Sequence, residues 1–382
     1  MSLPIDAAAI SDAGGGLSLR LSQPGPIPLN VALDCRPGEV VALVGPSGSG
    51  KSTTLRSVAG LYTARDGWVR SNGTVWFDAG QRVNLPARRR RVGFVFQSYA
   101  LFPHMTALEN IMLAMDHLPL AARAEQARRL IAVVHLAGLE DRYPAQLSGG
   151  QQQRVAVARA LARDPEVLLL DEPFSAVDKA TRQRLYVELA ELRRAVRAPI
   201  LIVTHDLDEA SLLADRLCIL HRGEALQTGT PLEIKTRPVN SAVARLVDIR
   251  NLFEGRVLDH DPGKQRTYVR WREQTLEVAL AERFEPGERV LWCVPTSSIL
   301  LHSRVRPSRG ERENPVSGAV RDMVVLGDGA RITMAVEGGD GPPLTLTVPL
   351  HVVHRNVLSV GEAITVTLMG DGIHLLKWEE GV

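Results

Sequence analysis

The stretch ALVGPSGSGKST, residues 42–53, decides the fold. An apolar run typical of a buried strand leads into Gly45, and the spacing G-x-x-x-x-G-K-S from Gly45 to Ser52 is that of a phosphate-binding loop. The helical stretch TTLRSVAG follows directly. The alternative interpretation, a glycine-rich turn beside a solvated lysine, does not account for the strand and helix on either side. We therefore predict an α/β domain in which this loop holds the phosphates of a nucleotide.

The residues of this loop have separate predicted roles. Backbone N–H groups are expected to wrap the phosphates, Lys51 to supply a positive charge, and the Ser52 hydroxyl to coordinate Mg²⁺. The predicted nucleotide-binding residues here are Gly45, Pro46, Ser47, Gly48, Ser49, Gly50, Lys51, Ser52 and Thr53.

Polar side chains also follow three other predicted strands. EVLLLDEP delivers Asp171 and Glu172, RVGFVF precedes Gln97, and PILIVT precedes His205. Ligands of α/β sheets bind at the carboxyl ends of the strands. We therefore predict Asp171 and Gln97 at the Mg²⁺ together with Ser52, Glu172 polarising the attacking water, and His205 at the γ-phosphate. Taken singly, these residues also fit ordinary turns and loops.

A second candidate phosphate site lies in QLSGGQQQR, residues 146–154, at the start of a predicted helix. The first N–H groups of a helix are unpaired and attract anions, although the spacing alone also fits a plain serine cap. A helical insertion over about residues 100–165 carries this segment away from the first loop. A second copy of the chain, related by a two-fold axis, can bring it to the nucleotide. The residues predicted to bind there are Ser148, Gly149, Gly150 and Gln151.

The composition is that of an ordinary globular protein, with 382 residues, 45% of them hydrophobic, and a net charge of +2. The small net charge argues against a nucleic-acid-binding surface. Three widely spaced cysteines fit a reducing compartment and no zinc site. No apolar run approaches the roughly 20 residues that span a bilayer. Residues 1–16 lack the features of a signal peptide and are predicted to be a flexible leader.

Strand-like and helix-like segments alternate over residues 17–236, which we predict to be one nucleotide-binding domain. Residues 237–250 are a predicted linker. Beyond them, over residues 251–382, short strands separated by Gly, Asp and Pro predict an all-β domain.

This C-terminal region contains a weak repeat. NLFEGRV (251–257) and NPVSGAV (314–320) share the pattern N-x-apolar-x-G-x-V, and a Gly-Glu pair before a β run follows each of them. We predict two related modules, over about residues 251–310 and 314–382.

In chain order, the first loop, Gln97, LSGGQQQR, VLLLDEP, SAVD (175–178) and His205 resemble the ATP-binding cassette ATPases. The resemblance covers the first predicted domain. It implies a P-loop NTPase (RecA-like) core with antiparallel β and helical subdomains, followed here by an all-β OB-like domain. It also implies ATP and Mg²⁺ as cofactors, a dimer that closes on ATP, and Asp178 at the nucleotide site.

FQSYALFPHMTALENI and the C-terminal β region resemble the importer branch of that family. This implies a homodimer or a pair with a related cassette chain, a membrane permease, and an extracytoplasmic solute-binding protein. It also implies a peripheral location on the cytoplasmic face of the cell (inner) membrane. DEPFSAVD, RRRRVGFVFQ and the two-module tail are most similar to the molybdate group, so molybdate or a related oxyanion is the first predicted cargo. Ferric iron, a polyamine or a sugar are the alternatives.

Three features depart from the family pattern or allow two interpretations. No aromatic residue precedes Tyr62, although many members stack adenine on an aromatic side chain about thirty positions before the loop lysine. Glu311 and Glu313 stand where oxyanion-binding modules carry hydroxyl groups, and carboxylates repel oxyanions. The run ARRRRV (87–92) fits a solvated strand edge better than a lipid-facing patch.

Other functional classes remain as alternatives. A non-transport ABC ATPase acting on nucleic acid usually has two cassettes, zinc-binding cysteines or a long coiled coil, and none of these is present in this sequence. A regulator that binds nucleotide without turnover is disfavoured by Glu172 beside Asp171, and an exporter by the lack of a fused membrane span.

Overall fold

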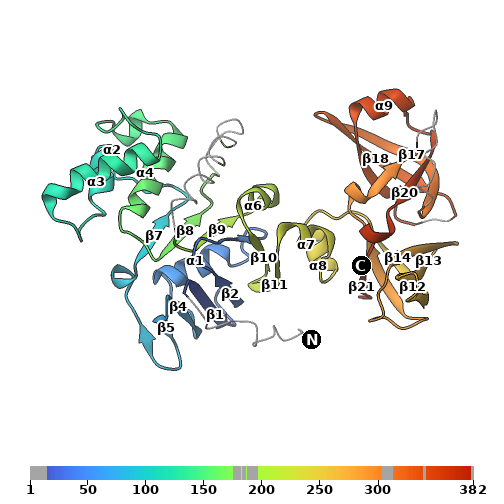
Figure 1. Cartoon of the computed structure of the whole chain (residues 1–382), viewed down its shortest axis with the longest axis horizontal. Helices are drawn as coiled ribbons and strands as arrows, with labels where there is room; N and C mark the ends of the chain where they lie inside the picture. Colours follow the sequence, from blue (N-terminus) through green and yellow to red (C-terminus); the bar gives the residue numbers. More distant parts are fainter. Residues whose placement is uncertain are drawn as a thin grey trace. The chain divides into compact units, whose positions relative to one another are not determined.

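The computed structural model divides the chain into two compact units, Met1–Pro231 and Leu232–Val382 (Figure 1). The structure describes residues 15–174, 182, 186, 197–302, 313–338 and 341–379. Most of the predicted leader therefore lies outside the described residues. Among the described residues, no helix combines the length and the apolar character needed to cross a bilayer.

A mixed sheet forms the core of the first unit. Its strands are β1 (Leu17–Gln23), β2 (Leu29–Cys35), β3 (Val40–Val44), β4 (Asp66–Ser71), β5 (Thr74–Asp78), β6 (Val83–Asn84), β7 (Val92–Val95), β8 (Val167–Asp171), β9 (Ile200–Thr204), β10 (Arg216–His221) and β11 (Glu224–Gly229). In the described part of the chain these eleven strands lie in the order β6-β5-β4-β1-β2-β11-β10-β3-β9-β8-β7. Strands β10, β3, β9, β8 and β7 are parallel, and the pairs from β6 to β2 are antiparallel.

The burial of the strands follows their sequence patterns. Every residue of β3, β8 and β9 is buried, as expected for parallel strands covered on both faces. By contrast, β1 alternates between buried and more exposed residues, as expected for an antiparallel strand with one face in the core. The predicted α/β P-loop NTPase fold is confirmed. Its parallel strands end at one edge of the sheet. The phosphate loop follows β3 there, Gln97 follows β7, Glu172 follows β8, and His205 follows β9.

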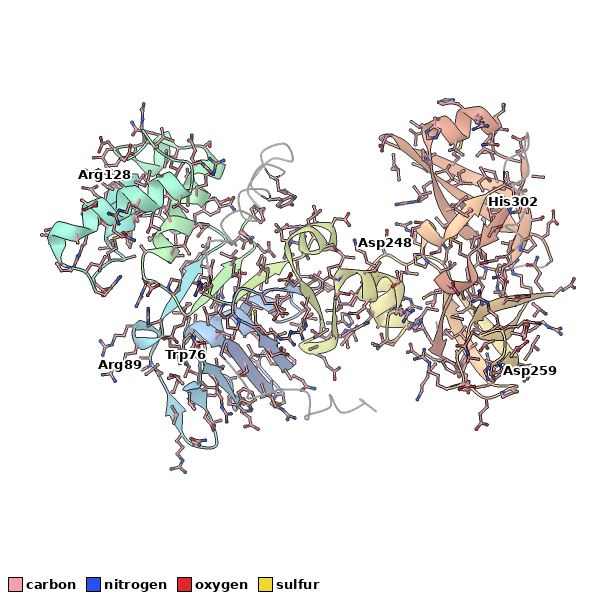
Figure 2. All side chains as sticks on the ribbon, in the orientation of Figure 1. Trp76, Arg89, Arg128, Asp248, Asp259 and His302 are labelled. Carbon is pink, nitrogen blue, oxygen red and sulfur yellow. The ribbon has the colours of Figure 1, made fainter. Side chains whose placement is uncertain are left out.

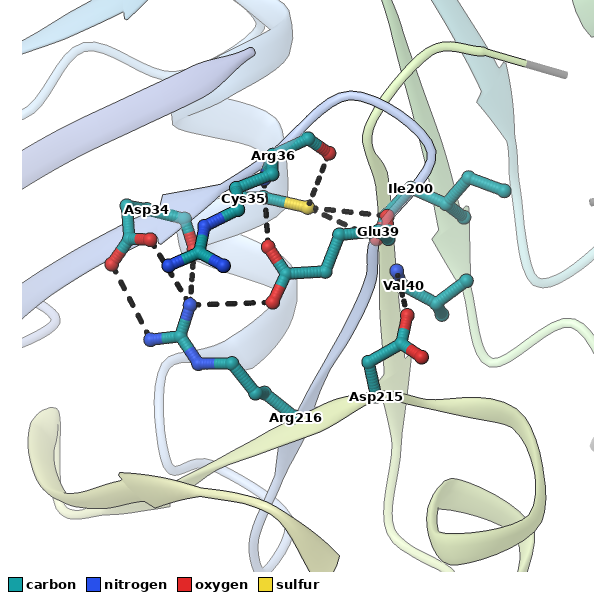
Figure 3. A network of polar contacts seen from close by, with 8 residues as sticks. All are labelled: Asp34, Cys35, Arg36, Glu39, Val40, Ile200, Asp215 and Arg216. Carbon is teal, nitrogen blue, oxygen red and sulfur yellow. Dashed lines mark hydrogen bonds and ion pairs between the residues drawn. The ribbon is translucent and has the colours of Figure 1, made fainter. Parts of the chain in front are cut away.

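The opposite edge of the parallel strands is held by a polar network (Figure 3). The Arg216 guanidinium lies 3.0 Å from the Asp34 carboxylate and 3.3 Å from that of Glu39. The Cys35 thiol lies 3.4 Å from the Glu39 carbonyl oxygen. Burial, and then the charge of Glu39, raises the pKa of the Cys35 thiol, which stays neutral. The network ties the end of β2 to the starts of β3 and β10.

Helices α1 (Lys51–Ala59) and α6 (Leu207–Leu213) pack against the parallel strands. Three further helices, α2 (Ala107–Met112), α3 (Leu120–Val133) and α4 (Gly149–Leu161), pack on one another, and α4 also contacts β7 (Figure 1). Thr106 begins α2 with a capping box, in which its hydroxyl accepts from the Glu109 N–H and the Glu109 side chain accepts from the Thr106 N–H. These three helices lie within the segment in which the sequence predicts a helical insertion.

The interpretation of ARRRRV as a solvated edge is wrong for one of its arginines. A short 3₁₀ turn, Ala87–Arg89, precedes Arg90, whose side chain is buried. Arg90 Nη1 donates to the carbonyl oxygens of Ser57 (2.8 Å) and Val58 (2.7 Å) at the end of α1, and Nε donates to that of Leu85 (2.8 Å). The charge is therefore used to cap the helix that begins at the phosphate loop.

The second unit contains two five-stranded antiparallel sheets. It begins with α7 (Pro231–Thr236) and α8 (Ser241–Leu246), so the segment predicted as a linker includes a helix. Its remaining elements are β12 (Leu252–Asp261), β13 (Arg266–Trp271), β14 (Gln274–Ala279), β15 (Arg289–Cys293), β16 (Ile299–Leu301), β17 (Pro315–Leu326), β18 (Gly329–Val336), β19 (Leu344–Pro349), α9 (Leu350–Asn356), β20 (Ala363–Leu368) and β21 (His374–Lys377). The strand orders among the described residues are β14-β13-β12-β15-β21 and β16-β20-β17-β18-β19.

The two sequence repeats of the C-terminal region interlock. Asn251 exchanges hydrogen bonds with the backbone of Thr345, and Asn314 does the same with Glu277, so the first residue of each repeat is held by the other repeat. Strands β16 and β21 likewise pair in the sheet of the other repeat. Both sheets contribute to one apolar core. A small module buries too little apolar surface by itself, and sharing the core buries more.

Candidate nucleotide site

The loop between β3 and α1 folds around the amine of Lys51. Lys51 Nζ donates to the carbonyl oxygens of Gly45 (2.7 Å) and Pro46 (2.9 Å). Burial lowers the pKa of Lys51, while the nearby Glu172 and Asp171 oppose this by favouring the charged form. Lys51 is also the first residue of α1, so its charge stands beside the positive end of the helix dipole. The loop therefore presents an anion-binding surface.

At two positions of the loop, steric constraints require glycine. A Cβ on Gly45 would lie 2.0 Å from the carbonyl oxygen of Leu220, at the end of β10. Gly50, which precedes α1, has a φ of 94°, a left-handed conformation that a side chain disfavours. The first position therefore needs glycine because the loop passes close to β10, and the second because of its backbone conformation.

The residues present fit ATP with Mg²⁺. Ser52 Oγ lies 2.8 Å from Asp171 Oδ1, which brings together two oxygen ligands of the kind that Mg²⁺ prefers. The Ser49 hydroxyl is buried and has no hydrogen-bond partner among the described residues, as expected of a group that serves a phosphate oxygen. Mg²⁺ held here would neutralise charge on the β- and γ-phosphates.

Glu172 is the point at which two other strand ends meet. Gln97 Nε2 donates to Glu172 Oε2 over 3.1 Å, and His205 Nδ1 lies 3.5 Å from the same oxygen. Glu172 itself has a φ of 46°, a strained conformation for a residue with a side chain, and its N–H donates to the carbonyl of Val203. The turn after β8 thus directs this carboxylate toward Gln97 and His205.

The second group of predicted residues lies at the start of α4. Ser148 Oγ accepts from the N–H of Gln151 (3.3 Å), and Gln151 Oε1 accepts from the N–H of Ser148 (2.9 Å). This capping box leaves the N–H groups of Gly149 and Gly150 at the helix start. Among the described residues, Ser148 makes no hydrogen bond to the Lys51 loop or to Gln97, Glu172 and His205. Asp178 lies outside the described residues.

The model of the family "ABC transporter" matches residues 29–175. Sulfate/thiosulfate import ATP-binding protein CysA 2 of Agrobacterium fabrum is 48% identical over 59% of this chain and 66% of that protein. Spermidine/putrescine import ATP-binding protein PotA of Oleidesulfovibrio alaskensis is 39% identical over 82% of this chain and 83% of that protein.

A third relative, Fe(3+) ions import ATP-binding protein FbpC of Rhizobium etli, is 36% identical over 91% of this chain and 93% of that protein. The chain belongs to the ABC transporter ATP-binding proteins. A solved dimeric structure of an ATP-binding cassette bound to ADP and Pi is 33% identical, with a TM-score of 0.48, over 56% of this chain and 98% of that one. As a family member, this ABC protein is an ATPase that uses ATP with Mg²⁺.

Two residues near His205, Thr204 and Glu209, were not predicted as site residues from the sequence of this ABC ATPase. Thr204 Oγ1 donates to Glu209 Oε2 over 3.1 Å and accepts from the N–H of Asp206, so it fixes the turn that carries His205. Burial raises the pKa of the Glu209 carboxyl to about 7. The spacing D-x-x-E from Asp206 to Glu209 is a helix-start pattern and was the available signal.

Proposed function

We propose that this ABC ATPase is the energy-supplying subunit of an importer. In this proposal it sits peripherally on the cytoplasmic face of the inner membrane, joined to a permease that receives solute from a binding protein. The proposal is supported by the relatives, whose names describe import ATP-binding proteins. The observation that carries the catalytic part is the meeting of Gln97, Glu172 and His205, next to the Ser52–Asp171 pair.

In the proposed mechanism of ATP hydrolysis, each of these side chains has a separate role. The Lys51 amine, which donates to two loop carbonyls, would donate to the phosphate oxygens of a nucleotide bound in the loop. Ser52 and Asp171 would hold Mg²⁺, with Gln97 able to reach the metal or the water. Glu172 orients the attacking water and accepts its proton, while His205 contacts the γ-phosphate. Most of the catalysis is then positioning and charge neutralisation.

The second phosphate site is assigned to a partner chain. In the proposed dimer, the α4 start of one protomer faces the nucleotide on the Lys51 loop of its partner, and each nucleotide is held by both chains. Ser148, Gly149, Gly150 and Gln151 make this contact, and Asp178 acts at the same interface. Opening and closing of this interface with ATP hydrolysis would drive the permease.

For the cargo we propose a small oxyanion. The sulfate/thiosulfate relative supports this class, and molybdate remains the more specific hypothesis from the sequence, although none of the three relatives above carries molybdate in its name. Ferric iron and polyamines are the alternatives that the other two names suggest. Glu313, whose carboxylate accepts from the N–H of Gly370 (3.1 Å), supports a C-terminal domain that does not itself bind the oxyanion.

The test is ATPase stimulation in the complex with its permease. Binding protein loaded with sulfate, molybdate, ferric iron or spermidine is added in separate reactions, with unloaded binding protein as the reference. An oxyanion importer is stimulated by the loaded sulfate or molybdate protein only. Stimulation by iron or spermidine alone, or by none of the four loaded proteins, would overturn the oxyanion cargo. An assembled, ATP-hydrolysing complex that sugar-loaded binding protein also fails to stimulate would overturn the importer assignment.

A further inference from the structure

Arg159 links helix α4 to the segment after Gln97, although 60 positions separate Arg159 from Tyr99 in the chain. It lies in the last turn of α4, the helix that begins after Ser148. Its guanidinium donates from Nη2 to the carbonyl oxygen of Tyr99 and from Nη1 to that of Ala100, both over 2.8 Å. Tyr99 and Ala100 follow directly on Gln97 and Ser98.

The backbone of this segment needs such a support. Tyr99 has a φ of 59° and Ala100 a φ of 46°, so two consecutive residues with side chains adopt the left-handed conformation. That conformation is unfavourable for L-residues and persists only where the surroundings impose it. The planar fork of an arginine can hold two adjacent carbonyl oxygens at once, whereas a lysine ammonium acts as a single point charge.

The same segment contacts the catalytic turn after β8. Gln97 donates to the carboxylate of Glu172, and the buried Tyr99 donates from its hydroxyl to the carbonyl of Pro173 over 3.5 Å. On the other side, the ring of Phe102 lies 5.9 Å from the Arg159 guanidinium carbon. Arg159 therefore connects the last turn of α4 to the segment that contacts Glu172 and Pro173.

We propose that Arg159 is a positioning residue that couples the Ser148 helix start, which faces the partner's nucleotide, to Gln97 and Glu172 in its own site. This rests on the proposed function. Only in the shared-site dimer does the start of α4 face the partner's nucleotide while its last turn contacts the nucleotide site of its own chain. Arg159 thus makes hydrolysis at one site depend on closure at the other. It touches neither nucleotide nor metal.

The test compares the full-length Arg159→Ala and Arg159→Lys chains with the wild type. Misplacing catalytic groups by about 1 Å costs about 100-fold in rate, so Arg159→Ala should lower kcat by about 100-fold. Since the Lys51 loop is untouched, KM for ATP should stay within about threefold. Arg159→Lys should recover part of kcat, because one carbonyl regains a donor. The Hill coefficient for ATP should fall toward 1 in both variants.

The control is Arg128→Ala, which removes an exposed arginine of α3 (Figure 2) and should leave kcat, KM and the Hill coefficient unchanged. ATP-driven dimerisation is measured in parallel, with Glu172→Gln added to each chain. A wild type that neither dimerises nor hydrolyses ATP contradicts the proposed function itself. If the wild type does both, two results overturn the role of Arg159 alone. The first is an Arg159→Ala chain with unchanged kcat and Hill coefficient. The second is an Arg159→Lys chain that loses kcat and ATP binding in parallel.

Discussion

The Ser52 hydroxyl and the Asp171 carboxylate lie 2.8 Å apart, although 119 positions separate the two residues in the chain. Ser52 is on the first turn of α1 and Asp171 is the last residue of β8. The contact exists because parallel strands end at one edge of the sheet and the helix after the phosphate loop starts at that edge. It brings together two oxygen atoms of the kind that coordinate Mg²⁺.

Replacing Ser52 by alanine removes one of the two proposed Mg²⁺ ligands. Mutation of a group that supports a metal ligand typically costs about 10- to 100-fold in metal affinity or activity. Loss of a ligand itself should cost no less, so the Mg²⁺ concentration for half-maximal ATPase activity should rise at least about tenfold. The measurement is a Mg²⁺ titration of ATPase activity. Ser57→Ala is the matched control, because its hydroxyl donates to a backbone carbonyl within the same helix. An unchanged titration in Ser52→Ala would contradict the assignment.

Glu209 should make the first unit less stable as the pH rises. Its pKa is raised from 4.5 to about 7 by burial, so the folded chain keeps a proton that the unfolded chain releases. The stabilisation is complete below pH 4.5 and is lost as the pH rises through about 7. Glu209→Gln stays neutral, and its stability relative to wild type should increase by about 3 kcal/mol between pH 4 and pH 8.

Urea unfolding of the first unit at several pH values measures this difference. The control is Asp208→Asn, a change at the neighbouring exposed carboxylate, which should give the same pH dependence as the wild type. A Glu209→Gln chain whose stability follows that of the wild type at every pH would show that the carboxyl is ionised normally.

Arg90 should matter far more for stability than its neighbours in the arginine run. Arg90→Ala leaves the carbonyl oxygens of Ser57, Val58 and Leu85 without this donor, and each unsatisfied buried group costs about 1–3 kcal/mol. We expect a loss of about 3 kcal/mol or more in the free energy of unfolding. Arg89→Ala, at an exposed position (Figure 2), should change it by no more than about 0.5 kcal/mol. Equal effects of the two substitutions would refute the capping role.

The base of the nucleotide should be only weakly selected. Residues 24–28, after β1, contain no aromatic side chain, and the nearby Tyr62 accepts a hydrogen bond from Gln23 over 2.8 Å. Base–aromatic stacking is typically worth about 1–3 kcal/mol, so without it GTP should compete with ATP within about tenfold. Competition binding with the two nucleotides measures the ratio. A preference for ATP of about a hundredfold or more would rule this out.

The sequence predicted the local units of the fold and of the site. The loop around Lys51, the buried strands before Asp171 and His205, and the helix start at Ser148 each have a contiguous pattern with a physical cause. Arg90 and Arg159 were missed because both donate to backbone carbonyls of distant segments, and a carbonyl has no sequence signature. The exchange of β16 and β21 was missed for a similar reason. A repeat shows that two strands are alike but not which sheet each one joins.

In the proposed dimer, each nucleotide is held by the Lys51 loop of one protomer and the Ser148 helix start of the other. The most direct measurement is the oligomeric state of Glu172→Gln by sedimentation, since this change leaves the loop intact and, in the proposed mechanism, stops hydrolysis. We expect a dimer with ATP and Mg²⁺, a monomer with ADP, and a monomer with ATP when Ser148→Arg is added. A Glu172→Gln chain that remains monomeric at saturating ATP would contradict the proposed dimer.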